Sequence, residues 1–189
     1  YALLQNAAEA MHIRLEVIRH NELLHNRRAI AGLRTDFVLF WDKDVLLARL
    51  LESAGFPVFN AAQAIEDCDN KGRTYVKLAL AGLPVPETVL APMTYDNIGY
   101  TDGGFISDAI DVLGFPMVLK ELYGSFGQQV YLARNAEELT SIQHRIGSKP
   151  FLMQRFIASS FGRDVRVNVV GDRAVAAILR HNEHGDFRS

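Results

Sequence analysis

The sequence is short of several features that define large classes of proteins. Cys68 is the only cysteine in 189 residues, which excludes a disulfide framework and a zinc site built from several cysteines. We expect this cysteine to be a small buried side chain. No apolar run approaches the roughly 18 residues of a membrane span. The start, from Tyr1, lacks the basic segment and cleavage site of a signal peptide. These absences favour a cytoplasmic protein without a membrane partner.

The sequence also lacks an excess of charge of either sign. It has 20 Lys and Arg residues against 22 Asp and Glu residues, for a formal net charge of -2. This balance argues against an electrostatic nucleic-acid binder, so we expect no nucleic-acid partner. Hydrophobic residues make up 49% of the chain, which is enough to build one large core or two small ones.

Residues 1–68 have the pattern of a small α/β layer with a parallel sheet. Helical spacing of apolar residues predicts a helix over 2–11, and apolar alternation predicts a strand over 13–18. The apolar run 37–40 is typical of a buried parallel strand. Asp44 is a candidate cap for the next helix, and a short strand is expected at 58–59. Because this layer begins with a helix, we expect a first strand to be missing.

Two interpretations remain open for Asp42 and Lys43, which lie between the apolar run and the capped helix. Ligands of parallel sheets gather at the carboxyl ends of strands, so these side chains could contact a substrate. The alternative is a helix cap with solvated charges. His12, His20 and His25 lie in the same region, but the sequence around them shows no carboxylate pattern that indicates a triad.

The rest of the chain predicts an α+β organisation. Helices are expected over 61–67, 73–81, 106–113 and 135–146, and extended segments over 87–90, 115–119, 130–132, 151–154, 165–170 and 174–179. The Pro-, Gly- and Asn-containing stretch 92–104 is the best candidate for a boundary or mobile loop.

A possible phosphate-binding loop follows the extended segment 115–119. That segment leads into Lys120, and Gly124-Ser125-x-Gly127 comes next. Small residues let backbone N–H groups approach phosphate oxygens, and a lysine supplies a positive charge. Taken alone, this stretch is equally a plain hairpin with a surface lysine. A later hairpin, with Asp164, Arg166 and Arg180, is open to two interpretations as well: a solvated sheet face or an anion site.

Several motifs, in order, resemble the ATP-grasp superfamily and most closely its RimK-like branch of carboxylate–amine ligases. They are Asp69-Asn70-Lys71, Gly82-Leu83-Pro84-Val85-Pro86, Phe115-Pro116-x-Val118-x-Lys120 with its glycine loop, Gln154-Arg155-Phe156-Ile157, Gly162-Arg163-Asp164-Val165-Arg166, and Arg180 with Gly185-Asp186-Phe187-Arg188-Ser189. The resemblance implies a pre-ATP-grasp α/β domain at 1–68, a linker helix and first ATP-grasp segment at 69–104, a lid subdomain at 105–157, and the start of a C-terminal subdomain at 158–189.

The resemblance also implies residue roles around ATP. Lys120 and Lys71 would lie near the phosphates, and Gly124, Ser125 and Gly127 would let the loop fold over them. The hinge residues Gln154, Arg155, Phe156 and Ile157 would contact adenine, and Asp164 the ribose. Ser189 is a further expected nucleotide contact. Arg180 and Arg188 would neutralise charge as the γ-phosphoryl group moves to a carboxylate, which an amine then attacks as an acyl phosphate.

Two departures from the family pattern qualify this expectation. Arg155 stands where the family hinge usually has Glu. The family's Mg²⁺ ligands, an Asp and a Glu-x-Asn set, come after the tail motif, so we expect no metal ligand before the chain stops at Ser189. We therefore expect a C-terminally incomplete, inactive piece of a ligase. The alternative is a non-catalytic nucleotide-binding module. The acceptor, a small molecule or a protein tail, and the assembly into homo-oligomers stay open.

Overall fold

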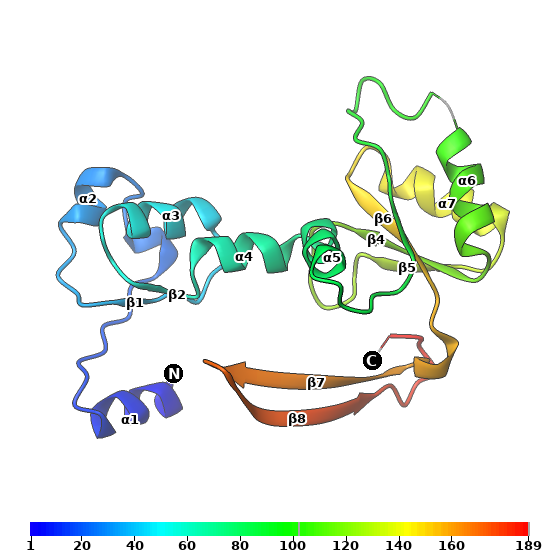
Figure 1. Ribbon diagram of the computed structural model, residues 1–189. Helices are drawn as coiled ribbons and strands as arrows, with labels where there is room; N and C mark the ends of the chain where they lie inside the picture. The colour runs from blue at the N-terminus through cyan, green and yellow to red at the C-terminus, as the bar shows by residue number, and fades with distance from the viewer. Residues whose placement is uncertain (102, 189) are drawn as a thin grey trace. The chain divides into compact units, whose positions relative to one another are not determined.

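The computed structural model describes residues 1–101 and 103–188. The chain divides into two compact units, Tyr1–Glu66 and Asp67–Ser189, and the boundary falls within helix α4 (Ala62–Asp69) (Figure 1). The mixed α/β fold class is confirmed, whereas the division into four segments stays a prediction. Cys68 corrects one expectation, because it is exposed on α4. No helix of the described residues has the length and apolar character that a membrane crossing requires.

The first unit contains a two-stranded parallel sheet with short helices. Its elements are α1 (Ala2–Ala10), the 3-10 turn η1 (His20–Glu22), α2 (Arg27–Ala31), β1 (Val38–Leu39), α3 (Val45–Ser53) and β2 (Val58–Phe59). Val38 pairs with Val58 in parallel register, as the apolar runs predicted. The Asp44 side chain accepts a hydrogen bond from the Leu47 N–H at 2.9 Å, which confirms the predicted cap of α3.

The strand predicted over 13–18 is wrong. The backbone there is irregular, and among the described residues of this unit only β1 and β2 pair as strands. The backbone N–H and C=O groups of a strand need a neighbouring strand as hydrogen-bond partner. An alternating apolar pattern does not show whether such a neighbour is present. The core of the unit lies instead where Ile30, Leu47, Leu51 and Val58 are buried together.

The second unit is built around a four-stranded antiparallel sheet in the order β3-β6-β4-β5 (Figure 1). Its elements are α5 (Lys71–Leu80), β3 (Thr88–Leu90), α6 (Gly104–Leu113), β4 (Met117–Glu121), β5 (Val130–Ala133), α7 (Ala136–Ile146) and β6 (Phe151–Arg155). The predicted helices and strands are all present, within a few residues of their expected ends. Asn135 caps α7 by accepting the Glu138 N–H at 2.9 Å.

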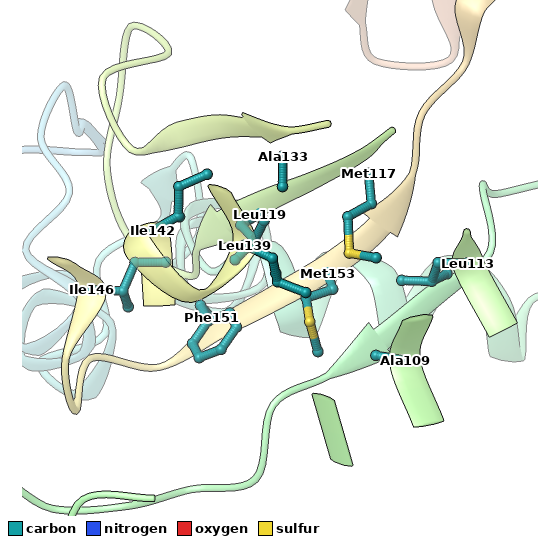
Figure 2. Packing of buried hydrophobic residues seen from close by; sticks show 10 residues of the cluster. All are labelled: Ala109, Leu113, Met117, Leu119, Ala133, Leu139, Ile142, Ile146, Phe151 and Met153. Carbon is teal, nitrogen blue, oxygen red and sulfur yellow. The ribbon is translucent and has the colours of Figure 1, made fainter. Parts of the chain in front are cut away.

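Two helices and the sheet enclose the core of this unit. Ala109 and Leu113 of α6, with Leu139, Ile142 and Ile146 of α7, are buried against β4 and β6 (Figure 2). From the sheet, Met117, Leu119, Ala133, Phe151 and Met153 complete the cluster. The 3.6-residue period of α7 places Leu139, Ile142 and Ile146 on one face of the helix, and this is the face that is buried.

A separate two-stranded hairpin follows the short turn η2 (Ala158–Ser160). Strands β7 (Arg163–Val170) and β8 (Arg173–His181) pair in antiparallel register. Val165 faces Leu179 and Val167 faces Ala177, so these side chains form one apolar face. That face is open, since Val165 is 62% exposed and Leu179 68% exposed.

Candidate functional site

The start of α5 is attached to the loop that joins β4 and β5, which we call the glycine loop (residues 122–129). The Lys71 N–H donates to the Leu122 carbonyl at 2.9 Å, and Lys71 Nζ donates to the Gly124 carbonyl at 3.1 Å. Asn70 caps the helix by accepting the Arg73 N–H at 3.0 Å. A Cβ on Gly72 would lie 3.1 Å from the Leu122 side chain, so the helix and the loop pack closely at this glycine. The structure thus brings Lys71 to the glycine loop.

Lys120 reaches the same region from the end of β4 and is held by a chain of hydrogen bonds. Its Nζ donates to Gln154 Oε1 at 2.7 Å, and Gln154 Nε2 donates to Thr88 Oγ1 at 2.8 Å. The Thr88 hydroxyl in turn donates to the Pro86 carbonyl at 2.7 Å. Three neighbouring strands therefore fix the position of one ammonium group.

The electrostatics of Lys120 favour an anion beside it. Burial lowers the pKa of Lys120, and the nearby positive charge of Lys71 lowers it further. A partly desolvated ammonium next to a second cation is stabilised when a negatively charged ligand approaches both. The predicted phosphate contact of Lys120 is consistent with this environment and stays a prediction.

The glycine loop has a backbone that other residues rarely adopt. Gly124 has φ 128° and Gly127 φ 71°, and Phe126 between them has φ 58°. A Cβ on Gly124 would lie 2.1 Å from Oε1 of Gln129, so a side chain there would have to displace Gln129. Among the described buried side-chain atoms, this Gln129 Oε1 has no hydrogen-bond partner. The Phe126 side chain is 97% exposed, so the loop tip extends into solvent.

The tail after β8 returns to the glycine loop. Arg188 Nη1 donates to the Gly127 carbonyl at 2.8 Å, and Arg188 Nε donates to Asp186 Oδ1 at 2.9 Å. The Arg188 side-chain and backbone hydrogen bonds lower the pKa of Asp186 to about 2. Arg188 thus lies beside the predicted phosphate loop, whereas Ser189 is outside the described residues.

Asp164 and Arg180 face each other across the β7–β8 hairpin. Arg180 Nε donates to Asp164 Oδ1 at 2.7 Å, and Arg180 Nη2 pairs with Asp164 Oδ2. Arg166, two residues after Asp164, lies on the same face opposite Ile178. The carboxylate therefore already balances one of the two arginines. The roles of Asp164 at the ribose and Arg180 in catalysis stay predictions.

The hinge residues have separate partners. The Arg155 N–H donates to the Glu87 carbonyl at 2.9 Å, and Arg155 Nη2 donates to the Val112 carbonyl, in the last turn of α6, at 2.8 Å. The Phe156 ring contacts the rings of Phe161 and Phe187 edge-on, with centroids 6.1 and 6.4 Å away. Ile157 is 41% exposed. An arginine at a helix C-terminus interacts favourably with the helix dipole, which gives Arg155 a structural role here.

Sequence reasoning assigned no role to three residues of this region: Thr88, Gln129 and Asp186, of which only Asp186 belongs to a quoted motif. Thr88 is 66 positions from its partner Gln154, so no local pattern connects them.

In the first unit, Asp42 Oδ1 accepts the N–H groups of Lys43 and Asp44 at 2.6 and 2.9 Å. This turn geometry favours the cap interpretation for Asp42 over a substrate contact.

Comparisons with known proteins agree with this geometry. The family model for the RimK-like ATP-grasp domain matches residues 68–189. Beta-citrylglutamate synthase B of Mus musculus is 39% identical over 149 residues, covering 78% of this chain and 37% of that protein. A probable alpha-L-glutamate ligase of Sodalis glossinidius (strain morsitans) is 34% identical over 192 residues, covering 100% of this chain and 59% of that protein.

A solved structure resembles the whole chain. The RimK domain ATP-grasp protein from Sphaerobacter thermophilus DSM 20745 is 26% identical, with a TM-score of 0.78, over 100% of this chain and 71% of that one. The chain thus spans well under two thirds of the length of the mouse synthase and most of the length of this structural neighbour. With a family model that covers all of β3 to β8, the chain belongs to the RimK-like ATP-grasp family of ligases.

Proposed function

We propose that the protein carrying this chain is an ATP-dependent ligase that joins a carboxylate to an amine through an acyl phosphate. The observation that carries the proposal is the meeting of Lys71 and Lys120, from two different elements, beside the Gly124 end of the glycine loop. Membership of a ligase family supports the reaction class. The names of the mouse and Sodalis relatives both contain glutamate, which supports glutamate as one of the two substrates.

In the proposed binding mode, the groups contact different parts of ATP. Lys120 binds oxygens of the α- and β-phosphates, Lys71 adds a second positive charge, and N–H groups of Gly124, Ser125 and Gly127 cover the triphosphate. The hinge from Gln154 to Ile157 contacts adenine, and Asp164 contacts the ribose. Gln154 has a second role, because it holds Lys120 in place.

The proposed chemistry depends on positioning and charge neutralisation. An oxygen of the substrate carboxylate attacks the γ-phosphorus, and ADP leaves. The amine then attacks the acyl carbon, loses a proton, and releases phosphate. Arg188 and Arg180 neutralise the charge that develops on the transferring group. The hydrogen bond from Arg188 to Gly127 supports this role for Arg188, since it holds the guanidinium beside the loop.

The described residues do not fit the Mg²⁺ that such a reaction uses. Asp164 and Asp186 are each bound to an arginine, so neither carboxylate is available as it stands. Among the described residues, three donors of the His, Cys, Asp and Glu kind come together only in the first unit. We therefore assign no magnesium ligand to this chain.

The alternative function is nucleotide binding without catalysis. One observation favours it: the Arg155 side chain is directed to the end of α6 and donates to Val112, so it provides no acceptor for adenine in the hinge. ATP binding without ADP formation, in the presence of glutamate and a panel of carboxylates and peptides, would favour this alternative. Formation of ADP with a peptide but not with small carboxylates would identify a protein acceptor.

Calorimetric titration of the natural protein with ATP tests the binding assignment. Lys120→Met and Lys71→Met should each weaken ATP binding at least about tenfold, because each removes a charged contact worth roughly 1.5–3 kcal/mol. Lys77→Gln is the matched control on the same helix, since Lys77 pairs with Asp67, which keeps Arg73 as a second partner. Unchanged ATP affinity in Lys120→Met would refute the assigned site.

A further inference from the structure

Three side chains that are distant in sequence meet in the first unit. His20, His25 and Asp44 each offer one donor atom, and these atoms all lie within 4.8 Å of one another. His20 Nε2 is 3.0 Å from Asp44 Oδ2, and His25 Nδ1 is 3.8 Å from the same oxygen. The two imidazole rings are edge-on, with centroids 4.4 Å apart.

The other nitrogen of His25 determines how this ring is used. His25 Nε2 lies 3.1 Å from the backbone carbonyl oxygen of His20. A carbonyl only accepts hydrogen bonds, so in the neutral ring Nε2 carries the hydrogen and Nδ1 has its lone pair toward Asp44 Oδ2. A metal-binding histidine is commonly oriented by such a bond from its second nitrogen to a carbonyl.

The carboxylate of Asp44 is oriented as well. Its Oδ1 accepts the Leu47 N–H at the start of α3, which leaves Oδ2 facing the two histidines. The carboxylate is therefore held with one oxygen on the helix cap and the other toward the histidines before any ion binds.

The spacing suits a small transition-metal ion. Tetrahedral zinc, with bonds of roughly 2.0–2.2 Å, places its ligand atoms about 3.3–3.6 Å apart. Two of the donor–donor distances, 3.0 and 3.8 Å, lie on either side of that value, and the two histidine nitrogens lie within 4.8 Å of each other, so side-chain rotations bring the three atoms to tetrahedral spacing. The three side chains are 27–49% exposed, so an ion and a water molecule can reach them.

We propose that His20 Nε2, His25 Nδ1 and Asp44 Oδ2 form a binding site for a divalent transition-metal ion, with Zn²⁺ the best match and water as the fourth ligand. A set of one carboxylate and two imidazole donors also suits Co²⁺ and Ni²⁺. It disfavours Mg²⁺, which prefers oxygen ligands. The ion would attach η1 and the His25 segment that follows it to the start of α3. This role is separate from the proposed ligase reaction.

Zinc titration of the natural protein against a chromophoric chelator tests the site, with visible absorption of the Co²⁺ form as a second measurement. We expect one ion per chain, and at least about tenfold weaker binding in His25→Ala and Asp44→Asn. Asp44→Asn keeps an oxygen for the Leu47 N–H, so the helix cap survives and a folding defect is avoided. Circular dichroism checks that each variant is folded.

A matched control uses the other neighbouring histidines of the chain. His181 is the last residue of β8, Glu183 and His184 follow it, and His181 Nε2 is 3.3 Å from Glu183 Oε1. The double variant His181→Ala, His184→Ala should bind zinc as the unmodified protein does. The proposal fails if zinc does not bind, or if binding survives His25→Ala and Asp44→Asn.

Discussion

The two β-hairpins of the second unit both contain strands rich in apolar residues, but they differ in the burial of those residues and in their connections. In β4, Met117 and Leu119 have no exposed side-chain surface, because β6, α6 and α7 surround them. In β7, Val165 and Val167 are 62% and 52% exposed. Apolar residues therefore predict strands in both hairpins, but what covers each strand depends on other elements.

The connections of the two hairpins differ as well. The glycine loop of β4–β5 is long, and Lys71 and Arg188 hold it from outside the hairpin. The β7–β8 turn is short, and a Cβ on its Gly171 would meet nothing within 4 Å. Glycine serves both connections through positive φ, but only in the first does it also make room for neighbouring groups.

The largest difference should appear when an apolar side chain is shortened in each hairpin. Leu119→Ala should lower the free energy of unfolding by about 2–5 kcal/mol, because it leaves a cavity in the core. Val167→Ala should change it by less than about 0.5 kcal/mol. Urea unfolding of this chain measures both. A large loss in Val167→Ala would show that the hairpin face is covered in solution and would break the comparison.

Substituting a glycine in each connection should weaken ATP binding only for the glycine loop of β4–β5. Gly124→Ala forces a Cβ into the Gln129 side chain at φ 128°, so we expect ATP binding at least about tenfold weaker. Gly171→Ala, at φ 61°, should cost about 1 kcal/mol of stability and leave ATP binding unchanged. Calorimetry with ATP and urea unfolding measure the two effects. Equal losses of ATP affinity would contradict a specific role for the glycine loop.

Removing a charge should also destabilise the β4–β5 hairpin more than the β7–β8 hairpin. Glu121 is buried at the end of β4, where it accepts the Tyr131 hydroxyl at 2.7 Å and pairs with Lys149 at 3.2 Å. Glu121→Gln should lower the free energy of unfolding by about 1–3 kcal/mol. Asp164→Asn, in the solvated pair with Arg180, should have a much smaller effect. Thermal unfolding measures the stability of both variants. Equal losses of stability would contradict the contrast between the two hairpins.

The smallest expected effect is a pH dependence that belongs to β4. Burial, and then the charge of Lys71, lowers the pKa of Lys120, so the unfolded chain binds that proton more tightly. The stability of the natural chain relative to Lys120→Met should therefore rise with pH, from the lowered pKa up to the unfolded value of about 10.4. Urea unfolding at several pH values measures it. For Arg166→Met, on the open hairpin, no such rise is expected.

Local sequence signals accounted for much of the second unit. Asn135 and the apolar period of α7 predicted a helix with its cap and buried face, and the glycine loop was recognised between two strands. Ordered motifs also identified the family before any geometry was known. Each of these features depends on residues that are close in the chain, which is why a linear pattern records them.

Tertiary structure decided the rest. The expected strand at 13–18 found no partner, and Cys68 was left exposed on α4. Gln154 holds Lys120 from 34 positions away, and Asp44 meets His20 from 24 positions away. By itself, the sequence determined the helices and strands of the second unit and the place of the glycine loop between two of them. Which charges, donors and acceptors meet depends on how strands and helices pack, and contacts between distant residues leave no periodic trace in one chain.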